Sequence, residues 1–432
     1  MSPTAITPDF EAATYRKVTR RLMPYLFLCY ILAYLGRVNV SFAKLQMQQD
    51  LGMSDSVYGL GAGIFFIGYF LFEVPSNLIL ARLGARYWIG PIMMIWGVVS
   101  SCTMFAHSAA TFYLLRFLLG VVESGFFPGV ILYLTFWYTS RYRARMVAVF
   151  MAAAPVSGVI AGPFSGWILD AMRGTAHLAG WQWMLLLEGF PAIAIGFFTL
   201  LFLTDNPAKA HWLTEEEKAI LLKRLAEEEE SKKRAGGGRH FGDAFRSGSV
   251  WLLALVYFGL CSANYGISFW LPQIIKDGIA NDPLTIGWIT AIPWTASAIA
   301  MIAWGRHSDS TGERRWHFAL SMFLVAAGFA GSTLPGLPGS LRLAALSFAC
   351  IGIMAAFGVF WALPTALLSG AAAAAGIAWI NSVGNLGGYA APYILGMIRD
   401  WRHSMTPGLI ALAAVALLAG VVALRLRREH TI

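Results

Sequence analysis

Several charged side chains lie inside long apolar runs of this sequence, and three of them suggest a chemical role together. Arg37 ends the run "CYILAYLGR", while Arg116 and Glu123 stand seven residues apart in "RFLLGVVES". A charge within a membrane costs a few kcal/mol even on lenient scales, and it commonly marks a site for substrates or ions. Arginine binds carboxylates, and a buried carboxyl group can take up and release a proton. These residue types therefore indicate a site for an organic anion and a proton.

Each of these charges also has a simpler explanation. Arg37 could extend to the membrane surface, but it stands about fifteen residues from the start of its run, which makes this difficult. Arg116 lies near one end of its run and could be an interfacial anchor. Glu123 could be the permanent counter-ion of Arg37, and this role is compatible with proton binding. A spacing of seven residues places Arg116 and Glu123 on one helix face, about 10.5 Å apart along the axis.

Polar and aromatic residues of other apolar runs could line the same cavity, although each alone is more often a packing residue. The candidates are Tyr34, Tyr69, Asn264, Tyr265, Trp361 and Asn385. Glu73 in "FEVPSN" is expected to be structural and to pair with basic loop residues near a gate.

Composition sets the class of protein in which these residues act. The chain has 432 residues, of which 57% are hydrophobic and only 13% are charged. Soluble domains carry about 25% charged residues. We therefore expect an all-α integral membrane protein, and the net charge of +9 lies in short loops rather than in a patch for nucleic acid.

Twelve apolar segments approach the ~20 residues that a membrane-spanning helix needs. Their approximate limits are 22–42, 57–80, 88–106, 111–136, 146–169, 184–203, 251–275, 284–304, 316–333, 343–365, 377–398 and 407–424.

Lys and Arg residues predict the orientation. With both termini in the cytoplasm, the cytoplasmic segments hold 24 of them and the opposite segments hold six. Such an excess of positive charge is typical of cytoplasmic loops. We expect both termini in the cytoplasm of a bacterial inner membrane.

The two halves of the chain echo one another. "NLILARLGARY" and "GRHSDSTGERR" both follow the second span of their half, at an offset of 228 residues. We expect an N-terminal six-helix half at 1–203, a cytoplasmic linker with an amphipathic helix capped by Thr214 at 204–250, and a C-terminal six-helix half at 251–432. Two pseudo-symmetric halves suggest transport by alternating access.

The motifs resemble those of the major facilitator superfamily and, within it, the anion:cation symporter family of tartrate, galactonate and aromatic-acid permeases, with sialin more distant. The supporting stretches are "YLGRVNVSFA", "GYFLFEVPSNLIL", "RFLLGVVESGFFPG", "GRHSDSTGERR", "PVSGVIAGPFSGW", "NYGISFWLPQIIK" and "NSVGNLGGYAAPYILG". The resemblance covers nearly the whole chain.

This resemblance implies roles for particular residues. It assigns Arg37 and Arg116 as anion ligands, Glu123 as the coupling acid, and Tyr69 and Asn385 as substrate contacts. It assigns gating or structural roles to Asp309, Arg314 and Pro163. Relatives usually carry an aspartate at the position of Gly36, so fewer protons or weaker coupling are expected here.

The expected function is import of a small organic carboxylate, such as a sugar acid or tartrate, together with protons. A facilitator or a carrier coupled to another ion, for example for aromatic carboxylates, is an alternative, and a transporter-like sensor is a remote one. No enzyme or nucleotide-binding motif occurs, so we expect no enzyme activity, cofactor or metal. A monomer is the default expectation.

Overall fold

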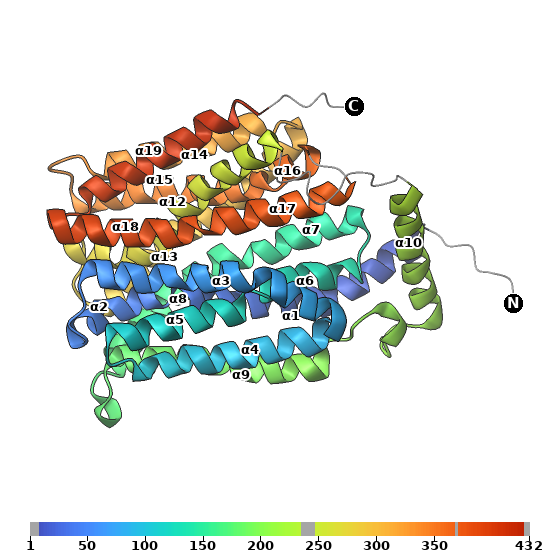
Figure 1. Cartoon of the computed structure of the whole chain (residues 1–432), viewed down its shortest axis with the longest axis horizontal. Coiled ribbons are helices and arrows are strands. Elements are labelled where there is room, and N and C mark those ends of the chain that lie inside the picture. Colours follow the sequence, from blue (N-terminus) through green and yellow to red (C-terminus); the bar gives the residue numbers. More distant parts are fainter. Residues whose placement is uncertain (1–7, 235–246, 368–369, 427–432) are drawn as a thin grey trace, which may run out of the picture.

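The computed structural model describes residues 8–234, 247–367 and 370–426, and these residues form helices and connecting loops without a strand. The long helices lie side by side along the length of the molecule (Figure 1). The helices of the N-terminal part are α1 (Pro8–Val38), α2 (Val40–Asp50), α3 (Asp55–Leu83), α4 (Ala85–Cys102), α5 (Ala109–Glu123), α6 (Phe126–Thr135), α7 (Ser140–Met151), α8 (Ala153–Ala171) and α9 (Gly180–Phe202), with short 3-10 turns η1 (Thr103–Phe105), η2 (Thr175–His177) and η3 (Pro207–Lys209).

A surface helix, α10, separates these helices from the C-terminal set. The remaining helices are α10 (Glu215–Arg234), α12 (Gly248–Gly278), α13 (Pro283–Thr311), α14 (Arg315–Ser332), α15 (Gly339–Phe360), α16 (Ala362–Leu367), α17 (Gly370–Asn385), α18 (Gly387–Arg402) and α19 (Thr406–Ala423). The expected cap of α10 is confirmed, because the Glu217 amide donates to Thr214 Oγ1 and Glu217 Oε2 accepts from the Thr214 amide.

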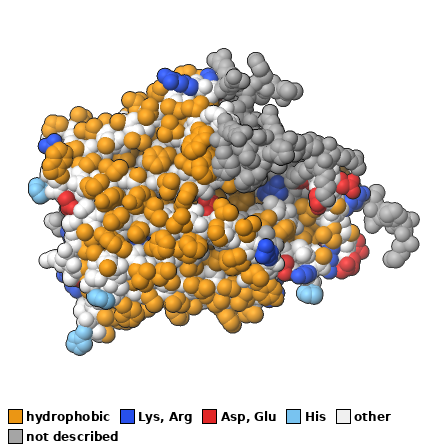
Figure 2. Space-filling view, viewed as in Figure 1, with side chains coloured by type: hydrophobic (Ala, Val, Ile, Leu, Met, Phe, Trp, Pro, Cys, Tyr) orange, Lys and Arg blue, Asp and Glu red, His pale blue; other side chains and the backbone are white. Residues whose placement is uncertain are grey.

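Ten helical segments of the described chain are long and apolar enough to cross a membrane. The other two expected spans correspond to α14 and to the consecutive helices α17 and α18. The result is the twelve-helix membrane fold that the sequence predicts. Hydrophobic side chains cover the visible face between the two ends, and charged side chains gather near the ends (Figure 2).

The molecule has two distinct ends. One, the α10 end, carries α10 and the start of α1, which are joined by ion pairs from Lys17 to Glu217 and from Arg224 to Glu11. The other, the α2 end, carries α2, the start of α3 and the end of α18 (Figure 1).

Several helices are interrupted close to the predicted site residues. The break between α1 and α2 follows Arg37, and the break between α5 and α6 follows Glu123. In the C-terminal set, Trp361 separates α15 from α16, and the break between α17 and α18 follows Asn385. The main chain keeps right-handed helical angles at these breaks, so each interruption is slight.

Glycines allow the N-terminal and C-terminal helices to touch near the α2 end. A Cβ on Gly162 of α8 would collide with the Gly287 carbonyl of α13, and a Cβ on Gly287 would collide with the Gly162 carbonyl. Gly59 of α3 and Pro392 of α18 meet in the same way. Small residues at such crossings permit close backbone approach in membrane helices.

Candidate functional site

Arg37 and Glu123 form a buried ion pair at the centre of the molecule. Arg37 Nε donates to Glu123 Oε1 at 2.9 Å, and Arg37 Nη2 contacts the same oxygen. Glu123 is fully buried, and its Oε2 has no hydrogen-bond partner among the described residues. One carboxylate oxygen is therefore committed to Arg37, while the other could receive a proton.

Arg37 also connects the two sets of helices. Its Nη1 donates to the hydroxyl of Tyr265 on α12 at 2.9 Å. The rings of Tyr34, Phe65 and Tyr69 surround the guanidinium, with centroids 5.3–5.8 Å from its central carbon. Aromatic faces stabilise a cation where water is scarce. Arg37 is thus held by an acid, a phenol and three rings.

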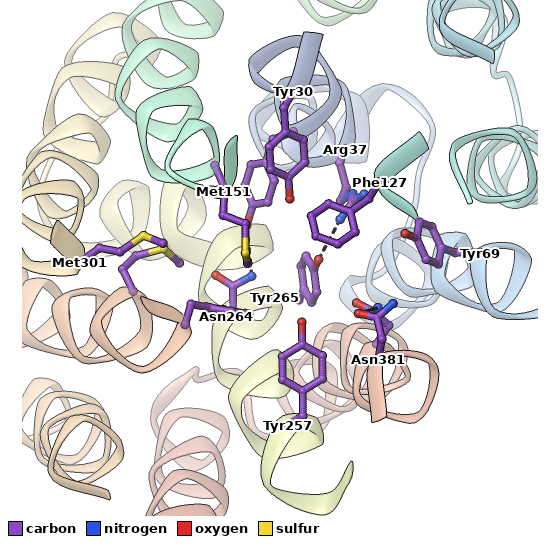
Figure 3. A pocket seen from close by; sticks show the side chains of 15 residues that line it. Tyr30, Arg37, Tyr69, Phe127, Met151, Tyr257, Asn264, Tyr265, Met301 and Asn381 are labelled. Carbon is purple, nitrogen blue, oxygen red and sulfur yellow. Dashed lines mark hydrogen bonds between the residues drawn. The ribbon is translucent and has the colours of Figure 1, made fainter. Parts of the chain in front are cut away.

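A cavity lies between the two sets of helices beside Arg37 (Figure 3). The space that the centres of water molecules could occupy in it is about 60 Å³. It is lined by Tyr30, Tyr34, Arg37, Tyr69, Phe127, Met151, Ala154, Tyr257, Asn264, Tyr265, Met301, Met354, Phe357, Asn381 and Asn385. Since α1 runs from the α10 end to the α2 end, Tyr30 and Tyr34 place the cavity on the α10 side of Arg37. Seven of these fifteen residues are aromatic, five of them tyrosines with a hydroxyl group, and three are asparagines.

Most of the predicted contact residues meet at this cavity. Tyr34, Tyr69, Asn264, Tyr265 and Asn385 all line it. The Asn264 amide donates to the Tyr34 hydroxyl at 3.1 Å, which is a second link between the two sets of helices.

Trp361 does not line the cavity. It packs against the ring of Tyr257 at 5.0 Å, and Tyr257 occupies the cavity wall instead. Sequence reasoning missed Tyr257 and Tyr30. Both could have been found, since Tyr30 stands seven residues before Arg37 and Tyr257 stands seven before Asn264, a spacing that repeats a helix face.

Arg116 is buried but does not line the cavity. Its guanidinium donates to the backbone carbonyls of Gly61, Ala62 and Arg37 at 3.3–3.4 Å. It therefore joins α5 to α3 and to the end of α1. The helix-face argument placed Arg116 and Glu123 on one side of a helix, but α5 directs Arg116 against the main chain of its neighbours.

Glu73 lies about three helical turns before the end of α3 and the basic loop that follows it. Its two carboxylate oxygens accept from Asn381 Nδ2 at 2.7 Å and from Ser382 Oγ at 2.8 Å, both on α17. The expected pairing with loop cations is therefore not what the structure has. The same Asn381 accepts from Asn385, so Glu73 orders the amides at the cavity edge.

The remaining predicted residues lie away from the cavity. Asp309, in the last turn of α13, pairs at 2.6 Å with Arg314, in the loop that follows at the α10 end. Pro163 follows Gly162 in α8, at the crossing with α13. Within the described residues no group of three or more His, Cys, Asp or Glu side chains is arranged to hold a metal ion.

A network of charges closes the α2 end, and sequence reasoning did not anticipate it. Lys44 of α2 is only 1% exposed, and its Nζ donates to Asp55 at 2.8 Å and to Gln273 of α12 at 3.2 Å. Its ammonium also lies over the rings of Tyr58 and Trp270. Loop charges were counted in the sequence, but partners more than 200 residues apart could not be matched.

The end of α18 completes this network, which we call the α2-end latch (Lys44, Asp55, Gln273, Asp277, Arg399 and Asp400). Arg399 pairs with Asp55 at 3.2 Å and with Asp277 at 2.9 Å. Asp400 accepts from the amides of Asp55 and Ser56, and so caps the first turn of α3. Burial raises the pKa of Asp400, but the hydrogen bonds that its carboxylate accepts from Ser56 and Asp55 lower the pKa by more. The pKa of Asp400 is therefore below its ordinary value.

The fold and the central charge pair define a secondary transporter, and comparison with known proteins agrees. The chain belongs to the Major Facilitator Superfamily, whose profile matches residues 26–392. It is similar to a putative tartrate transporter of Agrobacterium vitis, with 48% identity across 98% of this chain and 93% of the relative. It is also similar to the putative metabolite transport protein NicT of Pseudomonas putida, with 42% identity over 92% and 91% of the two chains.

Solved structures show the same fold. A bacterial homologue of the human lysosomal transporter Spinster, in an inward-facing and occupied conformation, superposes with a TM-score of 0.76. The superposition covers 95% of this chain and 96% of the other at 16% identity.

Proposed function

We propose that this protein is a proton-coupled symporter that imports a small organic carboxylate by alternating access. The observation that carries the proposal is the buried Arg37–Glu123 pair, whose arginine lines a central cavity. An arginine beside a cavity attracts a carboxylate, and its present counter-ion is itself a group that can be protonated.

Charge balance gives the order of events. Breaking a buried ion pair leaves an uncompensated charge and costs several kcal/mol. If Glu123 accepts a proton on its free oxygen, it becomes neutral, and Arg37 needs a new anion. A substrate carboxylate in the cavity can then replace Glu123. Release of substrate and proton on the far side restores the original pair.

The α2-end latch supplies the gate in this proposal. We place the α2 end outside and the α10 end in the cytoplasm, with both termini there, because the excess of Lys and Arg lies in segments at the α10 end. The structure then corresponds to a state that is closed to the outside. We further propose that helices of residues 1–203 and 251–432 move as two halves joined by 204–250, in a monomer of a bacterial inner membrane.

The cavity favours a hydroxylated carboxylate. Among the described residues one arginine faces it, and its other polar groups include hydroxyls of Tyr30, Tyr34 and Tyr69 and amides of Asn264 and Asn385. Such groups suit a sugar acid or a hydroxy-dicarboxylate, and the name of the Agrobacterium relative makes tartrate the first candidate.

Uptake into proteoliposomes tests the proposal. With an imposed gradient, acidic outside, wild-type protein should accumulate tartrate or a sugar acid, and a protonophore should abolish this accumulation. Glu123→Gln should retain substrate exchange at equal concentrations but lose accumulation, since glutamine resembles the protonated acid. Glu188→Gln is the matched control, because Glu188 of α9 is a buried carboxylate that accepts from Ser165 and does not line the cavity. Accumulation that ignores the pH gradient would contradict proton coupling.

The aromatic lining supports a second candidate, a facilitator or other-ion-coupled carrier of aromatic carboxylates. Tyr30, Phe127, Tyr257, Tyr265 and Phe357 could stack on an aromatic ring. Benzoate-like acids would then compete for uptake more strongly than tartrate, and a protonophore would leave transport unchanged.

A further inference from the structure

A basic groove opens at the α10 end, far from the central cavity. It has a volume of about 740 Å³ and is formed by the first turns of α1, the last residue of α9 and the segment before α10. Its lining residues are Ala13, Arg16, Lys17, Arg20, Arg21, Phe202 and Trp212. The α1 residues recur at helical spacing, so α1 presents one continuous basic face, while its opposite face, with Tyr15 and Val18, is buried.

The positive charge of this groove is largely uncompensated. Lys17 pairs with Glu217 at 2.6 Å. Arg16 and Arg20 are exposed and have no carboxylate partner among the described residues. Arg21 lies over the rings of Phe202 and Trp212, at 5.0 and 5.1 Å, instead of against an acid. The groove therefore offers several cationic donors to an anion.

Apolar surface continues from this groove along both helices. One turn before Phe202, Phe198 is 54% exposed, and its neighbour Leu201 is 65% exposed. On α1, Leu28 follows Arg21 by seven residues and is also exposed. The two helices are joined here by the Tyr25 hydroxyl, which donates to the Ile195 carbonyl. A molecule held in the groove thus has an apolar track toward the membrane interior.

We infer that this groove binds an anionic phospholipid of the adjacent leaflet. Arg16, Arg20 and Lys17 hold the phosphate, and the acyl chains lie against Phe198, Leu201 and Leu28. A free phosphate would use the cations but not the apolar track, which is why we assign a lipid. Basic pockets beside membrane helices on the cytoplasmic side recognise such head groups. The inference uses the orientation proposed above and is independent of the transported substrate.

Native mass spectrometry of the full chain in a neutral detergent tests this site. Dioleoyl phosphatidylglycerol should bind in preference to dioleoyl phosphatidylcholine. Arg16→Gln/Arg20→Gln should weaken phosphatidylglycerol binding about 30-fold, because each interfacial cation contributes about a fivefold factor. Arg20→Gln alone is a milder second variant, for which a fivefold loss is expected. Lys209→Gln/Lys223→Gln is the matched control, since both lysines are exposed and lie outside the groove.

Three results would overturn the inference. Equal binding of phosphatidylglycerol and phosphatidylcholine would show that the groove does not select an anionic head group. An equal loss of phosphatidylglycerol binding in the control variant would show that general surface charge, and not the groove, binds the lipid. Displacement of the lipid by glycerol phosphate at the same concentration would identify a site for soluble anions. Because no flux is measured, a failure here leaves the symport proposal intact, and a failure of symport leaves this test unchanged.

Discussion

At the residue scale, the central pair explains why charges occur in otherwise apolar helices. Arg37 contacts Glu123, a phenol and aromatic faces, and so is stabilised without water. Arg116 instead satisfies three backbone carbonyls. The two arginines have similar burial but different surroundings, and their substitution should have different consequences.

We predict that Arg37→Lys weakens substrate affinity, whereas Arg116→Gln weakens stability. Lysine keeps the charge but loses the forked contacts, so KM should rise about tenfold or more. Arg116→Gln leaves buried carbonyls without their donors and should cost about 2–4 kcal/mol, seen as a lower Tm in detergent. A higher KM with an unchanged Tm for Arg116→Gln would instead place this arginine at the substrate.

Gly36 lies against the indole of Trp96. A Cβ at Gly36 would lie 3.0 Å from Trp96 Nε1, which has no hydrogen-bond partner among the described residues. We predict that Gly36→Ala crowds this contact and lowers the free energy of unfolding by about 1–3 kcal/mol. The change should be seen as a lower Tm. Gly36→Asp should recover part of this loss by accepting from the indole and should add a second titrating group.

For Gly36→Asp and Gly36→Ala, the quantity to measure is the number of protons transported per substrate molecule. It is obtained by setting the pH gradient and finding the substrate gradient at which net uptake reverses. Gly36→Ala is the control for size. If Gly36→Asp has the same ratio as wild type, the glycine has no part in coupling.

At the element scale, contacts between helix ends hold the α2 end together. The last turn of α18 caps the first turn of α3 through Asp400, while Arg399 pairs with acids on α3 and α12. These contacts can separate only when the α2 end opens. In the proposed transport cycle, the latch therefore stabilises the closed state of this end.

We predict that Asp400→Asn opens the α2 end more often. The pKa of Asp400 is lowered in the closed state, so its charged form favours closure at pH values above its ordinary value of about 4. Closure should weaken as the pH falls through that range. At pH 7 the substitution should shift the closed-to-open ratio by about tenfold, given ~1–2 kcal/mol for a charged cap.

Spin labels at Gln49 and Arg402 report on this opening, since both residues are exposed near the α2 end. The distance between the two labels should be longer when the α2 end is open. The fraction of molecules with this longer distance should increase in Asp400→Asn and, at acidic pH, in the wild type. Asp282→Asn, in the cap of α13 outside the latch, is the control. An unchanged distance distribution would exclude Asp400 from gating.

At the scale of the whole molecule, the apolar spans and the distribution of Lys and Arg were enough to predict the twelve-helix fold. Within the site, the sequence indicated the Arg37–Glu123 pair and six of the fifteen residues that line the cavity, Arg37 among them, because isolated charges and polar groups stand out in apolar helices. It did not indicate the latch, whose partners lie on α2, α3, α12 and α18 and meet only after folding. It also misplaced Trp361, which packs against the ring of Tyr257, while Tyr257 lines the cavity.

The orientation has a direct prediction. A cysteine at Lys223 should be protected from a membrane-impermeant maleimide in intact cells, and a cysteine at Arg402 should react. Lysed cells provide the control, in which both positions should react. The reverse pattern would contradict the assigned sides of the membrane.

The central claim is that substrate and proton cross together through the Arg37–Glu123 pair. A pH-sensitive dye inside proteoliposomes, without any imposed gradient, measures this most directly. Addition of tartrate or a transported sugar acid to wild-type protein should acidify the interior in proportion to the substrate taken up. Glu123→Gln should exchange substrate without acidification. Substrate entry into wild-type vesicles with no change in internal pH would contradict the claim.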